Sequence, residues 1–145
     1  MKDASNYILT ELNTLLNGNI TYSGRTVKYY ALNQEPSDSE NLFMSVSSSY
    51  AQGDEGSKDS WLIPYTVNID IVNRVNSLSE KAVNEVSSLI SSAIWPTKST
   101  LGINASGEFS PIKVSITSRS LPESQFNGLW HIRKVLELEI LIKQL

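Results

Sequence analysis

The chain has 145 residues, which favours a single domain over residues 1–145; a domain of this size buries roughly 68–70% of its unfolded surface without disulfides or metals. It contains no cysteine and one histidine, which excludes thiol nucleophiles, disulfides and cysteine-based zinc sites. A formal charge of −3 argues against a general nucleic-acid coat, which needs clustered Lys and Arg. Serine and asparagine contribute 35 residues, so the composition predicts a soluble, non-enzymatic protein without cofactor or metal.

No targeting or membrane segment is expected. Residues 1–5 contain no apolar run of the kind that signal peptides have. The apolar stretches elsewhere in the chain fall far short of the ~20 residues that span a bilayer. We therefore expect a protein that is made and folded in a cytoplasm and has no membrane partner.

The first predicted element is an amphipathic helix near the N-terminus. Its apolar residues follow a period of 3.6: Ile8, Leu9, Leu12, Leu15 and Leu16. Asn17-Gly18 then supplies a residue that tolerates the left-handed conformation at a helix end.

From Ile20 onward the apolar period changes to two, which predicts strands. Residues 20–22 and 25–32 form a short hairpin around Ser23-Gly24, and residues 33–41 form a loop. Residues 42–50 alternate again and predict the next strand, which a polar loop follows.

The most regular strand pattern covers residues 61–73. Its apolar face carries Tyr65, Val67, Ile69 and Ile71, and its polar face carries Thr66, Asn68 and Asp70. Pro64 lacks an N–H and is expected at an edge or near the strand start. Pairing of this strand with residues 42–50 predicts a long-armed hairpin.

A second amphipathic helix is predicted from Ser79 to Trp95. Ser77-Leu78-Ser79-Glu80 matches a capping box, and Pro96 ends the helix. The expected apolar stripe consists of Ala82, Val83, Val86, Leu89, Ile90, Ala93 and Ile94.

Two further strands close the chain. In the first, Ile112, Val114 and Ile116 alternate with polar residues, and a polar loop with Pro122 and Gly128 follows. The last covers residues 129–145, with the following residues on its inward face: Ile132, Leu136, Leu138, Ile140 and Ile142. The elements predict a two-layer α+β fold, in which both helices pack on one face of a mainly antiparallel sheet that carries the long β-hairpin arm.

Few residues suggest catalysis or ligand binding. His131 lies at an outward strand position, which favours a surface or interface histidine over a catalytic one. Glu137 and Glu139 could share a proton or bind a hard cation, but the neighbouring Arg133 and Lys143 favour a paired, solvated surface. Asp70 is expected to be structural.

Four of the six tyrosines could form a stacking platform for bases or sugars, but too few basic residues are interleaved with them and packing is preferred. They are Tyr22, Tyr29, Tyr30 and Tyr65.

Acidic residues are concentrated in residues 33–60, which have a net charge of −5, whereas the whole chain has a net charge of −3. Simple solvation explains such a segment, and a negative surface that faces a partner or a channel is the functional alternative.

The order of these elements resembles a known family. It comprises the N-terminal helix, the hairpin Ile20-Thr21-Tyr22-Ser23-Gly24-Arg25-Thr26-Val27, the Pro36 loop, the long strand Tyr65-Thr66-Val67-Asn68-Ile69-Asp70-Ile71, the helix that ends before Pro96, and two closing strands. Over nearly the whole chain this order is similar to the tail terminator, or tail completion, proteins of tailed bacteriophages, the minor-tail-protein-U-like group. The similarity lies in the order of elements and not in an invariant motif.

The resemblance implies a structural virion protein of the tail or neck, assembled in the host cytoplasm. It implies a homo-oligomeric ring, usually a hexamer, that caps the tail tube protein and joins a head–tail connector protein, while DNA passes through the lumen without specific binding. The family has no catalytic, cofactor or metal residues to transfer.

With a ring of this kind as the resemblance implies, we expect the arm from Tyr50 to Trp61 to contact a neighbouring subunit or the tail tube. The candidate interface residues are Tyr50, Gln52, Asp54, Glu55, Lys58, Asp59 and Trp61. We also expect the acidic segment to face the lumen or the tube. Two alternatives stay open: another head–tail neck or adaptor ring component, and an unrelated small α+β binding module or hydrolase.

Overall fold

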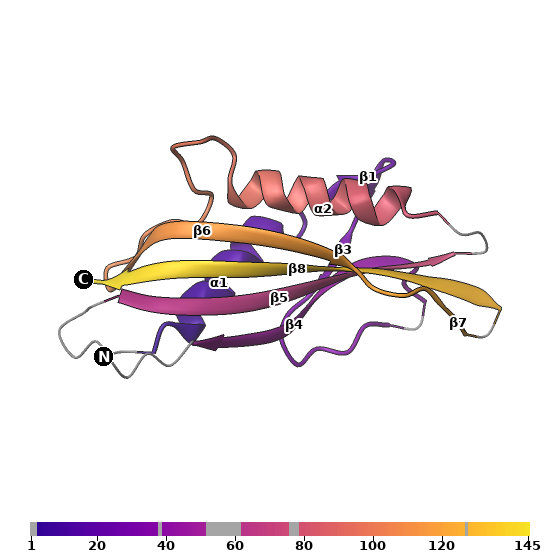
Figure 1. The fold of residues 1–145 in the computed structure, drawn as a ribbon, viewed down its shortest axis with the longest axis horizontal. Coiled ribbons are helices and arrows are strands. Elements are labelled where there is room, and N and C mark those ends of the chain that lie inside the picture. Colours follow the sequence, from indigo (N-terminus) through magenta and orange to yellow (C-terminus); the bar gives the residue numbers. More distant parts are fainter. Residues whose placement is uncertain (1–2, 38, 52–61, 76–78, 127) are drawn as a thin grey trace.

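The computed structural model describes residues 3–37, 39–51, 62–75, 79–126 and 128–145. They form a β-sheet with two helices packed on one face, as Figure 1 shows. This arrangement confirms the predicted α+β fold class. The elements are α1 (Ser5–Leu16), β1 (Thr21–Tyr22), β2 (Arg25–Thr26), β3 (Lys28–Tyr30), β4 (Leu42–Ala51), β5 (Leu62–Val75), α2 (Lys81–Ile94), β6 (Phe109–Ser120), β7 (Ser124–Phe126) and β8 (Leu129–Gln144).

The main sheet has the strand order β3-β4-β5-β8-β6, and β7 adds to β8 beyond the end of β6. All neighbours are antiparallel except β3 and β4, which are parallel. The predicted hairpin of β4 and β5 is present, with a register that runs from Leu42 opposite Asn73 to Ala51 opposite Tyr65. Pro64 lies near the start of β5, beyond this pairing, where its missing N–H leaves no gap in the β4 ladder.

One main apolar core fills the space between the sheet and the helices. Both helices contribute one face, and β5 and β8 contribute every second residue, as the two predicted periods require. Full burial of such a side chain is worth about 1.5–3 kcal/mol. The buried residues include Ile8, Leu12 and Leu16 of α1, Val86, Ile90 and Ile94 of α2, Val67, Ile69 and Ile71 of β5, and Leu136, Leu138 and Ile140 of β8.

Helix α2 differs from the prediction at its start and at one apolar position. It begins at Lys81, with Glu80 as the N-cap and no side-chain capping bond, so the predicted capping box is wrong. Ser79 Oγ instead accepts a hydrogen bond from the Lys81 N–H at 3.4 Å, while Ser77 lies outside the described residues. Leu89 was expected in the core but is 40% exposed, because it lies at the margin of the face that packs on β5 and β8.

The predicted strand over residues 25–32 is wrong as a single element. β2 pairs with β1 in a separate two-stranded sheet, and their turn places Ser23 at φ 53° and Gly24 at φ 78°. The chain changes direction at Val27, whose N–H donates to the Ile20 carbonyl at 2.8 Å. β3 then joins the main sheet beside β4.

Strand β6 contains a bulge that overturns the expected position of Ile112. Pro111 lies opposite Ile142 and Lys113 lies opposite Leu141, so Ile112 has no partner of its own in the ladder. Its side chain is 50% exposed instead of joining the core. The segment after β6, predicted as a loop, also contains the short strand β7.

A second, smaller apolar cluster lies on the sheet face that points away from the helices. It consists of Tyr30, Phe43 and Val72, next to the loop that follows β3. The Arg74 guanidinium lies 5.0 Å from the Phe43 ring centroid and donates to the Glu40 carbonyl at 3.3 Å. Arg74 therefore holds the loop over one end of that face.

Gly102 provides a test of the packing at the end of α2. Its N–H donates to the Ile94 carbonyl at 2.7 Å, and a Cβ at this position would lie 2.0 Å from the Ala93 carbonyl oxygen. Gly102→Ala should lower the free energy of unfolding by about 1–3 kcal/mol or more, since the obstacle is backbone. Gly107→Ala, where a Cβ meets nothing within 4 Å, should leave chemical denaturation almost unchanged. Equal stability of the two variants would contradict this packing.

Candidate functional site

The open face, defined here as the side of the main sheet that points away from the helices, carries the polar positions of the central strands. Because strand side chains alternate, the residues next to core positions project onto it. On β8 these include Glu137 and Glu139, which lie opposite Asn68 and Thr66 of β5. On the other side Glu137 lies opposite Thr117 of β6. The alternation predicted from the sequence placed these residues correctly.

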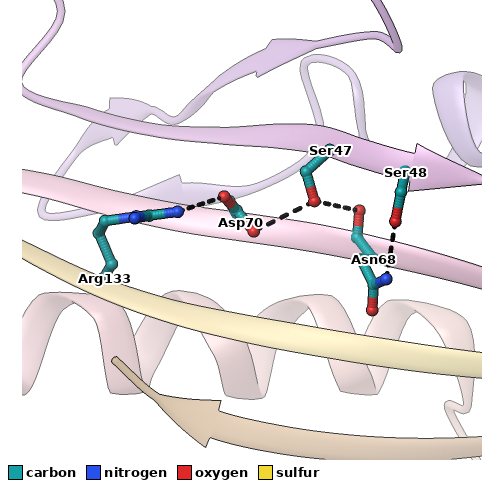
Figure 2. Close-up of polar contacts among 5 residues, drawn as sticks. All are labelled: Ser47, Ser48, Asn68, Asp70 and Arg133. Carbon is teal, nitrogen blue, oxygen red and sulfur yellow. Dashed lines mark hydrogen bonds and ion pairs between the residues drawn. The ribbon is translucent and has the colours of Figure 1, made fainter. Parts of the chain in front are cut away.

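A polar network crosses three strands of the open face, as Figure 2 shows. Arg133 Nη2 of β8 donates to Asp70 Oδ2 of β5 at 2.8 Å, and Ser47 Oγ of β4 donates to Asp70 Oδ1 at 3.2 Å. Asn68 Nδ2 donates to Ser48 Oγ at 2.7 Å. The structural role predicted for Asp70 is confirmed, since this carboxylate links β4, β5 and β8.

The two glutamates of β8 are not paired as expected. Arg133 bonds Asp70 and not Glu137, and no ion pair to Glu137 or Glu139 is found among the described residues. The same part of the chain contains no group of three or more His, Cys, Asp or Glu side chains suited to a metal ion. On the open face, Glu137 is half-buried and Glu139 is exposed.

The four tyrosines of the predicted group pack in or against the apolar clusters of the protein, as preferred from the sequence. Tyr29 and Tyr65 belong to the main core, Tyr22 packs against it, and Tyr30 lies in the second cluster. Burial raises the pKa of Tyr29 to about 12. Tyr7 of α1 likewise has its pKa raised to about 12, first by burial, and its hydroxyl donates to the Asn104 carbonyl at 2.5 Å. These hydroxyls support packing and form no platform on the surface.

A groove of about 590 Å³ runs between α2 and β6. Ile116 and Ser118 of β6 line one side of it, and four serines of α2 line the other. Sequence reasoning missed this groove, although the polar side of the helix pattern already held three of these serines, Ser88, Ser91 and Ser92. The four are Ser87, Ser88, Ser91 and Ser92.

The main sheet has two free edges among the described residues. β6 pairs with β8 only, so its outer side carries unpaired backbone groups. On the opposite side, β3 covers β4 only from Phe43 to Ser45, which leaves residues 46–51 without an outer neighbour in the described chain. The described part of the chain thus has two different free edges.

Most of the interface residues expected from the sequence lie outside the described residues. Of that set the structure describes only Tyr50, which is 50% exposed at the end of β4. The other six are Gln52, Asp54, Glu55, Lys58, Asp59 and Trp61. Of the acidic segment, Glu35 is exposed and Glu40 is half-buried in the loop before β4. The predicted contacts of the arm and the lumen placement of the acidic segment stay predictions.

Comparison with solved structures gives only distant likeness. No protein-family model matches the chain, and no curated protein matches it. Among solved structures, a chain of the "Virion of native gene transfer agent (GTA) particle" is 14% identical, with a TM-score of 0.46, over 90% of this chain and 84% of that one. This likeness is too distant to assign a family or a function.

No described helix is long and apolar enough to cross a membrane.

The ion pair of the open face allows a quantitative test. The side chains of Arg133 and Asp70 are 42% and 17% exposed, so solvent screens their attraction. A double-mutant cycle with Asp70→Ala and Arg133→Ala should give a coupling free energy of about 0.2–1 kcal/mol in denaturant unfolding. The matched cycle with Asp70→Ala and Lys143→Ala should give a coupling near zero. A larger coupling for Lys143 would contradict the observed pairing.

Proposed function

We propose that this chain is a structural virion protein of a tailed bacteriophage or a similar particle, and that it acts as the tail terminator. In this role a ring of subunits, with six as the expected number, caps the tail tube and joins it to the head-side connector. DNA passes through the lumen without specific binding. The chain then works through shape and interfaces and performs no catalysis.

The observation that carries the proposal is the presence of two different free edges on one sheet. A closed ring needs a heterologous contact, in which one surface of a subunit meets a different surface of the next. The outer sides of β6 and of residues 46–51 meet this requirement. A two-fold dimer, by contrast, needs only one surface that pairs with itself.

The order of elements gives independent support. The resemblance to tail terminators rests on an N-terminal helix, a small hairpin, a long strand that leads into a helix, and two closing strands. The described structure contains that order as α1, β1–β2, β5 followed by α2, and β6 with β8. The likeness to the gene transfer agent chain is too weak to add to this argument.

The closest alternative is a different ring of the neck, such as a head–tail adaptor. The same free edges suit that role, so the partner distinguishes the two: the tail tube on one side, and the portal or connector on the other. An unrelated small α+β binding module is the remaining alternative, and for it no ring is expected.

The proposal predicts ring formation that depends on the tail tube. The purified chain should shift from monomer to a ring-sized species when tail tubes of the same particle are added, measured by size-exclusion chromatography with mass detection. Negative-stain images should then show rings at one end of the tubes. Binding to the isolated connector without binding to tubes would favour the adaptor, and a chain that stays monomeric with both would contradict the proposed function.

A further inference from the structure

The outer edge of β6 is regular over only part of its length. At its start, Pro111 has no N–H and the bulge at Ile112 distorts the ladder, two features that hinder pairing with another strand. From Val114 to Ser120 the register with β8 is uninterrupted. This stretch is therefore the part of the edge that can accept a further strand.

The surroundings of this stretch leave room for such a strand. α2 packs on β5 and β8, and the groove of about 590 Å³ separates it from Ile116 and Ser118. A strand added beside β6 would project every second side chain over this groove. The small serines of α2 that line the groove leave space for those side chains.

We infer that the edge from Val114 to Ser120 pairs, antiparallel, with the free edge of β4 from Ser48 to Ala51 in a second copy of this chain, because the β4 register is regular only beyond the bulge between Val46 and Ser48. This inference rests on the proposed ring and identifies the contact that would close it. The added strand extends the sheet from one subunit into the next.

The strand directions agree with this contact. β4, β5, β8 and β6 are successive antiparallel neighbours, so β4 and β6 run in opposite directions at the two sides of the sheet. A rotation about an axis along the strands keeps these directions. It therefore brings β4 of one copy antiparallel to β6 of the next.

The side-chain phase restricts the register. Ser48 and Tyr50 lie opposite Asn68 and Thr66, which places them on the open face, and Thr117 projects onto the same face. With Ser48 opposite Thr117, Tyr50 lies opposite Ser115, and the helices of both copies stay on one side of the shared sheet. Tyr50, which is 50% exposed in the single chain, becomes part of the contact.

Charge favours this arrangement over pairing of β6 with itself. A two-fold β6 pair centred on Thr117 would place Ser115 opposite Arg119 of the other copy, with Lys113 as its diagonal neighbour on the same face. Both cationic side chains are exposed, and the two-fold axis doubles their repulsion. The edge from Ser48 to Ala51 carries no charge and meets them without repulsion.

Engineered disulfides test the contact directly, because the chain contains no cysteine. Ser48→Cys and Thr117→Cys are combined in one chain, and the protein is oxidised mildly, alone and with tail tubes. We expect a ladder of covalent oligomers that ends at the ring. A second pair, Ser48→Cys with Ser115→Cys, covers the register that is shifted by two residues.

Three controls separate the alternatives. Each single variant should give almost no ladder; Thr117→Cys alone would form a dimer efficiently if β6 paired with itself, and that result would overturn the inference. Ser39→Cys with Thr117→Cys places the first thiol on an exposed loop away from the β4 edge, and should not cross-link.

The outcomes also separate this inference from the proposed function. Rings in negative stain without a ladder from either cysteine pair would overturn the edge contact and leave the tail terminator proposal intact. A ladder without rings at tail tubes would support the edge contact and contradict the function. A chain that stays monomeric and gives no ladder would contradict both.

Discussion

The pairing of β5 with β8 is the interaction on which the rest of the structure depends. The two strands are paired without interruption from Leu62 opposite Lys143 to Val75 opposite Trp130. On one face of the sheet, the apolar residues of both strands belong to the main core, in which they pack against α1 and α2. On the open face the same strands carry Asp70 and Arg133, whose ion pair links β5 to β8. Both faces of the protein are therefore set by one ladder.

Much of this fold could be predicted from the sequence, because period two and period 3.6 are local properties. The inward residues of β8, the two helices and the β4–β5 hairpin all follow from such patterns. The errors occur where tertiary contacts decide. A bulge leaves Ile112 without a partner in the ladder, and Leu89 lies at the margin of the α2 face that packs on the sheet. Residues 25–32 are divided between two sheets.

The candidate interface was harder to predict, since strand order is not a local property. β6 and β8 are consecutive long strands, but nothing in their residues says that β8 enters between β5 and β6 and leaves β6 at the edge. The groove beside α2 follows from the same order. Serine and asparagine are abundant in the composition, and the structure shows two roles for them. Ser47 and Ser48 form hydrogen bonds with Asp70 and Asn68 of the neighbouring strand, and the small serines of α2 line the groove.

Two different free edges, a polar open face and helices confined to the opposite face together describe a subunit suited to head-to-tail assembly. Comparing amide hydrogen exchange of the proposed ring with that of the monomer tests this claim most directly, because new backbone hydrogen bonds slow exchange. We expect new protection in both segments, Val114–Ser120 and Ser48–Ala51, and no change in the exposed face of α1. Rings in which both segments exchange as fast as in the monomer would contradict the account.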